Sequence, residues 1–204
     1  MDGIWDETTA TKRICGMLRN QFKDDYSQFV RLSGKGRVVD DICYVGDYYV
    51  LPLDKAGKRK SNLANLGFAA ALMLIQVAAG MVNQDSSRTF WIVYPYLFIF
   101  LPLAYLFVGV FSSWGDPVRM QKAQYETGLA RMRRSSIGAM ALSAFSAVLD
   151  AVYMLLHHGE IRMGRELLYL SCHILFLAAA FLYGAYYNKT YGGLRIEKSE
   201  SKLE

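Results

Sequence analysis

Four stretches of about 20 residues that are almost free of charge constrain the fold of this chain more than any other feature. An α-helix needs about 20 predominantly apolar residues to cross the roughly 30 Å hydrocarbon core of a membrane. The four stretches are Leu63–Asn83, Thr89–Phe111, Ser136–His157 and Leu167–Tyr187. Asp150 is the one residue within them that carries a formal charge. The sequence therefore predicts an all-α membrane protein built as a bundle of four transmembrane helices.

The remaining charge lies between and outside these stretches. Over the whole chain 53% of residues are apolar and 20% are charged, whereas soluble domains average about 45–50% and 25%. This uneven distribution excludes a soluble enzyme, a disordered chain and a small secreted domain held by disulfides. It divides the chain into an N-terminal arm (1–60), a transmembrane domain (61–188) and a C-terminal tail (189–204).

The positions of lysine and arginine predict the orientation in the membrane. Twenty of the 23 basic residues lie in the arm, in the loop between the second and third spans, or in the tail. Because cytoplasmic segments are enriched in lysine and arginine, we expect both termini and this middle loop to be cytoplasmic. The net charge of +5 then reflects orientation and contact with anionic lipid headgroups, not nucleic-acid binding. We expect an integral protein of a bacterial plasma membrane.

Two further features concern the spans themselves. Pro95 and Pro102 are expected to kink the second span, because proline removes a helical hydrogen bond. Amphipathic aromatic rings favour the membrane interface, which predicts a cytoplasmic aromatic belt. Its members would be Trp114, Tyr183, Tyr186 and Tyr187.

The arm has patterns of its own. Apolar residues recur at spacings of three and four over Thr9–Leu32, which predicts an amphipathic helix. Arg37–Tyr44 and Tyr48–Leu53 read as two strands of a hairpin that turns at Gly46 and Asp47. We therefore expect a small cytoplasmic α/β appendage. In the middle loop, a second amphipathic helix is predicted to begin near Pro117.

Two basic clusters are candidates for contact with lipid or with a protein partner. One directly precedes the first span and the other ends the middle loop. Their members are Lys58, Arg59, Lys60, Arg131, Arg133 and Arg134. The first cluster is read mainly as a topological anchor, and a basic amphipathic helix beside a membrane normally lies in the interface. Docking of a protein partner on the middle loop is the other interpretation.

Polar residues within the spans predict a buried layer. Ionisable groups at membrane depth are costly and are functional candidates by default. Asp150 and His173 should lie at similar depth in the outer half of an antiparallel pair of helices. Ser143, Ser146, Tyr153 and His157 extend a polar stripe from Asp150 along the third span. The candidate site is Asp150, His173, Gln76, Ser146 and Tyr153. It is either a structural Asp150–His173 pair or a site for a proton, an ion or a solute.

No sequence motif indicates catalysis, a cofactor or a metal. His157, His158 and His173 are the three histidines, but neither a His-x-x-x-His nor a His-Glu-x-x-His spacing occurs, so we predict no metal site. The chain has no Cys-x-x-Cys pair, phosphate-binding loop or nucleophile elbow. We therefore expect a protein that is not an enzyme.

Two functions agree with these patterns. The first is a non-catalytic accessory or regulatory membrane subunit, whose arm and basic middle loop bind a partner or the lipid surface. The second is a small-solute or ion transporter, proton-linked in one version, that acts as an oligomer through the Gln76, Asp150 and His173 layer. The small-residue pairs Gly67 with Ala71 and Ala180 with Gly184 would permit close packing of helices, within one bundle or in a homo-oligomer.

Overall fold

The protein is described by a computed structural model covering residues 22, 25–32 and 38–198. Its helical elements are α2 (Lys55–Met81), η2 (Asp85–Arg88), α3 (Phe90–Phe98), α4 (Phe100–Trp114), α5 (Lys122–Tyr125), η3 (Glu126–Ala130), α6 (Arg131–Leu156) and α7 (Met163–Tyr191). Four helices among the described residues are long and apolar enough to cross a membrane, with α3 and α4 forming one of them and α5, η3 and α6 another. The four predicted stretches thus coincide with four long helices.

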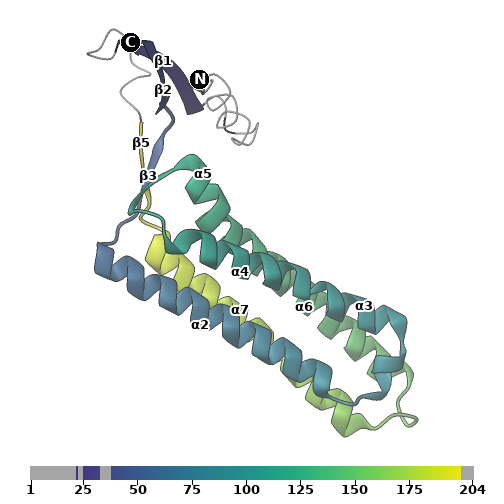
Figure 1. Ribbon diagram of the computed structural model, residues 1–204. Coiled ribbons are helices and arrows are strands. Elements are labelled where there is room, and N and C mark those ends of the chain that lie inside the picture. Colours follow the sequence, from purple (N-terminus) through teal and green to yellow (C-terminus); the bar gives the residue numbers. More distant parts are fainter. Residues whose placement is uncertain (1–21, 23–24, 33–37, 199–204) are drawn as a thin grey trace, which may run out of the picture.

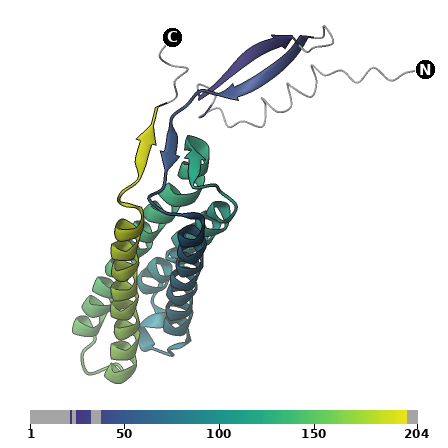
Figure 2. The ribbon, with the colours of Figure 1, turned by 90° about the vertical axis from the view of Figure 1, so that its left-hand side faces the viewer.

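The four long helices form one elongated bundle (Figure 1). α2 packs against α4 and α7, and α6 packs against α3, α4 and α7. The short η2 connection and the turn between α6 and α7 meet at one end, which we call the hairpin end. The small strands lie at the opposite end, which we call the sheet end (Figure 2).

The bundle is apolar outside and partly polar inside. Large apolar side chains such as Leu74 and Leu155 are 69% and 79% exposed on its surface. In contrast, Asn65, Asp150 and His173 are completely buried between the helices. A soluble protein places these residue types the other way round, so the arrangement agrees with an integral membrane protein.

Pro102 accounts for a break in the second span. α3 ends at Phe98 and α4 begins at Phe100. A continuous helix would require the nitrogen at position 102 to donate to the carbonyl of Phe98, and proline has no N–H. Pro95 lies inside α3, where the helix continues. The second span is therefore interrupted at Ile99, before Pro102, whereas Pro95 does not interrupt α3.

The first span begins earlier than the sequence predicted. The Asp54 side chain accepts a hydrogen bond from the N–H of Gly57 at 2.7 Å and caps α2. Because this cap fixes the helix start at Lys55, the whole basic cluster that precedes the apolar stretch is helical. Gly67 and Ala71 lie on the exposed face of α2, and the position of a Cβ on Gly67 has no neighbour within 4 Å. This pair does not pack against the other helices of the bundle.

The strands correct the prediction for the arm. They are β1 (Tyr26–Leu32), β2 (Val38–Tyr44), β3 (Tyr48–Val50), β4 (Arg119–Gln121) and β5 (Arg195–Glu197). The predicted amphipathic helix over Thr9–Leu32 is wrong at its C-terminal end, because Tyr26–Leu32 is a strand; residues 9–21 lie outside the described residues. The apolar residues of Tyr26–Leu32 are equally compatible with a β-strand that pairs with a neighbouring strand.

The predicted hairpin partners are also wrong. β2 pairs antiparallel with β1, and β3 is the centre of a separate sheet of order β4-β3-β5. Both neighbours of β3 are antiparallel to it. Segments from the arm, the middle loop and the tail therefore form one sheet, which the local sequence pattern could not reveal.

The middle loop differs from its prediction as well. Residues 119–121 form β4, so the helix does not begin near Pro117 but at Lys122. It then passes through the η3 segment, a π-helix, directly into α6. Leu129 and Met132 are buried against the bundle. The predicted interfacial helix is thus the first part of the third long helix.

Tyr183 and Tyr187 do not form the expected aromatic belt. Tyr183 is completely buried and Tyr187 is 7% exposed. The Tyr187 hydroxyl donates to the carbonyl of Leu129 at 3.0 Å. These rings fill the bundle core near the sheet end, because they lie on the α7 face that is directed toward α2 and α6. Trp114, in contrast, is 44% exposed.

Candidate functional site

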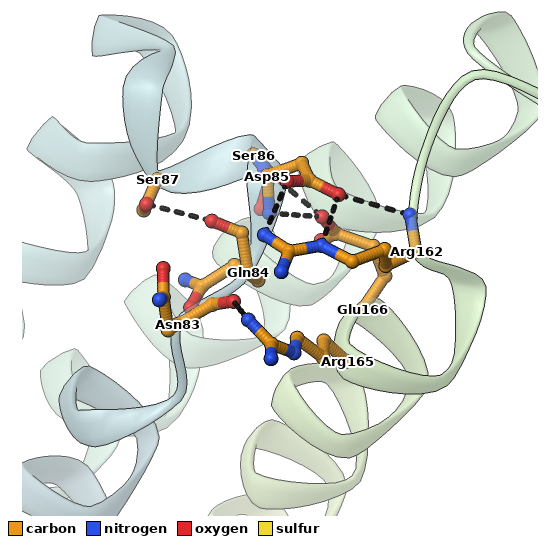
Figure 3. Close-up of polar contacts among 8 residues, drawn as sticks. All are labelled: Asn83, Gln84, Asp85, Ser86, Ser87, Arg162, Arg165 and Glu166. Atoms are coloured by element: carbon orange, nitrogen blue, oxygen red, sulfur yellow. Dashed lines mark hydrogen bonds and ion pairs between the residues drawn. The ribbon is translucent and has the colours of Figure 1, made fainter.

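An ion pair joins the two connections at the hairpin end. Arg162 Nη2 lies 2.8 Å from Asp85 Oδ1, and the backbone N–H of Arg162 donates to Asp85 Oδ2 at 2.9 Å (Figure 3). The hydrogen bonds from Arg162 lower the pKa of Asp85 to about 2. Arg165 adds a hydrogen bond from Nη1 to the carbonyl of Asn83 at 3.0 Å. The first helical hairpin, formed by α2 with α3 and α4, is therefore held at this end to the second hairpin, formed by α6 and α7.

Glu166 lies directly behind this ion pair. Its Oε1 accepts hydrogen bonds from the backbone N–H groups of Asp85 and Ser86, at 2.8 and 2.9 Å (Figure 3). The residue is in the first turn of α7 and is completely buried. A carboxylate in the first turn of a helix is favoured by the helix dipole. Glu166 therefore connects α7 to the loop between the first two spans.

Asp150 faces this carboxylate and not His173. The Asp150 carboxyl lies near the side chains of Glu166 and Ser86 and makes no hydrogen bond to either. Asp150 and His173 make no hydrogen bond or ion pair in the described part of the chain, so the expected Asp150–His173 pair is not formed. The prediction placed the two residues at similar depth. His173 instead contacts Ser146 and Ser143, which lie one and two turns before Asp150 on α6, and Asp150 is left opposite Glu166.

His173 is held by two serines of α6. Its Nδ1 lies 3.1 Å from Ser143 Oγ and its Nε2 lies 3.3 Å from Ser146 Oγ. The Tyr169 ring packs edge-on against the imidazole, with centroids 4.7 Å apart. All four side chains are buried. The imidazole therefore links α6 to α7 through hydrogen bonds on both of its nitrogens.

Gln76 and Tyr153 occupy other parts of the polar core. Gln76 Nε2 donates to the carbonyl of Tyr96 at 3.2 Å, and the Tyr96 hydroxyl donates to the carbonyl of Gln76 at 3.1 Å. This reciprocal pair joins α2 to α3. Tyr153 is 8% exposed and packs near Trp91, with ring centroids 6.0 Å apart. All five predicted site residues thus point into the bundle, and Ser146 is hydrogen-bonded to His173, whereas Gln76, Asp150 and Tyr153 form separate contacts.

Several buried oxygen atoms at the hairpin end have no hydrogen-bond partner among the described residues. They are Oδ1 and Oδ2 of Asp150, Oε2 of Glu166, Oγ of Ser86, and the side-chain carbonyl oxygens of Gln76 and Gln84. Buried polar atoms are normally paired. These oxygens lie together at one end of the bundle, where a proton, a water molecule or another donor would pair them.

The first basic cluster divides into one structural residue and two exposed ones. Lys58 is 8% exposed. Its Nζ donates to the carbonyl of Pro117 at 3.0 Å and also to that of Asp116. Burial raises the pKa of the neighbouring Asp116, and the charge of Lys58 opposes this effect. The prediction of a lipid or partner contact is therefore wrong for Lys58, whereas Arg59 and Lys60 are exposed.

The second basic cluster lies at the start of α6. Arg133 and Arg134 are exposed and Arg131 is half-buried. Arg134 forms an ion pair with Glu126 at 2.8 Å. Arg133 lies at the edge of an apolar groove of about 330 Å³ between α6 and α7, which Gly184 also lines. These positions leave Arg133 available to contact a lipid headgroup or a partner.

Aromatic rings dominate the sheet end. Tyr49 stacks on Tyr125 with centroids 4.4 Å apart, and the Arg119 guanidinium lies 4.0 Å above the Tyr48 ring. Tyr44 receives a hydrogen bond from the N–H of Lys122 at 3.0 Å. Burial raises the pKa of the Tyr44 hydroxyl. These contacts bind the strands β3 and β4 and the start of the third long helix into one unit.

The histidines lie apart from one another. His157 stacks on Tyr153 with centroids 4.3 Å apart, His158 is exposed, and His173 is bound by serines. Within residues 22, 25–32 and 38–198, no three His, Cys, Asp or Glu side chains are close enough together to hold a metal ion.

Comparison with known proteins adds no assignment. Neither a family model, nor a curated protein, nor a solved structure matches this chain. Its function has to be inferred from its own residues.

Sequence reasoning missed Glu166 and Ser86. Glu166 directly precedes the fourth apolar stretch, and Asp85 and Arg162 are opposite charges in the two short connections. Two antiparallel hairpins bring such connections to the same end of a bundle. The opposite charges could therefore have indicated the ion pair, but the burial of Glu166 had no local sign in the sequence.

Proposed function

We propose that this chain is a non-catalytic membrane protein that acts as an accessory or regulatory subunit. It binds a protein partner through its sheet end. The observation that carries the proposal is the sheet β4-β3-β5, which unites residues from the arm, the middle loop and the tail. A protein that only anchored itself in lipid would not need these three distant segments to form one surface.

The composition of this surface supports binding of a protein. We call the strands β3, β4 and β5 together with α5 the sheet-end surface. Tyr48, Tyr49 and Arg119 belong to it, and tyrosine and arginine are enriched in protein interfaces and their energetic centres. Ile196 of β5 is 58% exposed, and the Arg119 and Glu197 side chains are 58% and 53% exposed. The surface thus offers aromatic, apolar and charged groups together.

The proposed orientation follows from the distribution of charge. Arg59, Lys60 and Arg133 are exposed near the sheet end, where they would contact the anionic headgroups of a cytoplasmic leaflet. We therefore place the sheet end in the cytoplasm and the hairpin end outside, in a bacterial plasma membrane.

Photo-crosslinking in intact cells tests this function. A photoreactive amino acid replaces Ile196 at the sheet-end surface, Leu155 on the exposed apolar face or Glu160 at the hairpin end. The proposal predicts an adduct of one discrete mass with a second protein from position 196, and no adduct of that mass from positions 155 and 160. If position 196 gives no adduct, or if all three positions give the same one, the sheet end is not a specific binding surface.

One observation favours transport as a second candidate function. Gln76, Asp150 and His173 are buried inside the bundle and come from three different spans. Substitution Asp150→Asn separates the two candidates, because a proton-linked carrier should lose flux in proteoliposomes while it remains folded. A partner-binding subunit should lose stability at most and should retain its crosslink from position 196.

A further inference from the structure

We propose that Asp150 and Glu166 bind one proton between them, and that this proton joins α6 to α7 inside the membrane. The site lies at the hairpin end, opposite the sheet-end surface. It therefore rests on neither the partner nor the orientation proposed above.

The two carboxyl groups cannot both carry a charge at this place. Asp150 and Glu166 are both completely buried, and their carboxyl groups approach each other. Two carboxylates that share one dry site cannot both remain ionised at low cost. The neighbouring arginines bind other groups: Arg162 binds Asp85, and Arg165 donates to the carbonyl of Asn83. A proton is the smallest ligand that removes the repulsion.

The surroundings of the two carboxyl groups decide which of them carries the proton. Glu166 Oε1 accepts two backbone N–H groups, those of Asp85 and Ser86. Such donors stabilise an ionised carboxylate, and the first turn of α7 adds the favourable helix dipole. Neither oxygen of Asp150 has a hydrogen-bond partner among the described residues. Asp150 is therefore the neutral acid and Glu166 the anion.

The same proton gives two unpaired oxygens of the pair a partner. A proton on one Asp150 oxygen donates to Glu166 Oε2, which otherwise has no donor among the described residues. The buried Ser86 hydroxyl lies near Asp150 but makes no hydrogen bond to it. One proton thus pairs two oxygens, one of Asp150 and Oε2 of Glu166, without another ligand.

The groups around the pair do not supply an alternative partner. Asp85 and Arg88 lie on η2, Arg162 lies between α6 and α7, Tyr153 lies on α6 and Tyr169 on α7. Asp85 and Arg162 bind each other. Tyr169 is buried, and its neutral phenol leaves the charge of the pair unchanged at neutral pH. The titrating proton therefore belongs to the two carboxyls.

Infrared spectroscopy of the full chain in lipid nanodiscs tests the proposal. At neutral pH the wild-type protein should give the carbonyl band of a protonated carboxylic acid. Biosynthetic labelling with carbon-13 aspartate should shift this band, and Asp150→Asn should remove it. Glu160→Gln, at an exposed position, should leave it unchanged. If aspartate labelling shifts no carboxylic acid band, the proposal is overturned, and this result needs no variant to fold.

Equilibrium unfolding in detergent micelles provides a second test. A proton that is held in the folded state and released in the unfolded state makes the folding equilibrium constant fall by up to about tenfold per pH unit as pH rises. The wild type should show this dependence between about pH 6 and pH 8, because the aspartate of the unfolded chain is fully ionised throughout this range. The Asp150→Asn variant should not show it. Replacement of potassium by sodium should leave the unfolding free energy of both proteins unchanged. If sodium stabilises the wild type and not Asp150→Asn, the ligand is a metal cation and the proton proposal is wrong.

Discussion

The backbone N–H of Ser86 donates to the Glu166 carboxylate at 2.9 Å, across the boundary between the two helical hairpins. The same carboxylate oxygen accepts from Asp85 at 2.8 Å. The connection between the first two spans is thus fixed by a residue of the fourth span. Together with the ion pair of Asp85 and Arg162, this contact holds the hairpin end closed.

Loss of the Glu166 carboxylate should destabilise the bundle. Glu166→Ala leaves two buried N–H groups without an acceptor, and each should cost about 1–3 kcal/mol. Thermal unfolding in nanodiscs measures the effect, and Glu160→Ala serves as the matched control because Glu160 is exposed. Equal unfolding temperatures for the two variants would contradict the assigned role of Glu166.

The ion pair of Asp85 and Arg162 should depend on pH in the acid range. Its hydrogen bonds lower the pKa of Asp85 from 3.8 to about 2. A carboxyl with a depressed pKa in the folded state stabilises that state above its unfolded pKa, and this contribution is lost as pH falls. We expect the wild type to lose stability relative to Asp85→Asn between about pH 4 and pH 2. Because the pair is partly exposed and screened, the difference should be small, and it should decrease further in high salt.

A control variant separates this ion pair from other acid effects. In an Arg162→Gln background, the stability difference between the protein that retains Asp85 and the protein that carries Asp85→Asn should become smaller over the same pH range, because only the backbone N–H of residue 162 still donates to Asp85. If this difference is as large without the guanidinium as with it, the side chain of Arg162 does not control the titration of Asp85.

Lys58 should behave as a structural residue and Arg59 as a surface residue. Lys58→Met removes the donor that holds the carbonyls of Asp116 and Pro117, which should cost about 1–3 kcal/mol of unfolding free energy. Arg59→Met should change stability by less than about 0.5 kcal/mol, as is usual for exposed positions. A larger effect for Arg59 than for Lys58 would show that the two roles are reversed.

Cysteine accessibility should establish the orientation. Single cysteines at Glu160 and Arg119 probe the hairpin end and the sheet end in a background without native cysteines. A maleimide that does not cross membranes should label position 160 in intact cells and position 119 only after permeabilisation. Labelling of position 119 in intact cells would place the sheet end outside.

The four spans could be predicted because their cause is local. Each helix satisfies its own backbone hydrogen bonds, so lipid imposes its requirement on a continuous stretch of sequence. The break at Ile99 was also predictable in kind, since Pro102 lacks the donor that a continuous helix needs. The inward direction of Ser146, Asp150 and Tyr153 followed from their helical spacing.

The remaining features depend on contacts between distant residues. β3 is only three residues long, and its partners lie about 70 and 147 positions further along the chain. No local pattern encodes such pairing, so the strand of the arm was assigned to the wrong neighbour. Asp150 was paired with His173 from depth alone. Packing instead turns His173 toward Ser143 and Ser146, and this choice depends on the rotation of α7 about its own axis.

Disulfide crosslinking of Val50→Cys with Arg195→Cys tests the central structural claim most directly, namely that the arm and the tail pair in one sheet. These residues are paired across β3 and β5, and paired positions of antiparallel strands have Cα atoms about 4.5–5.5 Å apart, within the range of a disulfide. We predict rapid oxidation of this pair in native membranes and little for Val50→Cys with Ile196→Cys, whose side chains project from opposite faces. Equal or absent crosslinking of both pairs would contradict the sheet, and with it the surface on which the proposed function depends.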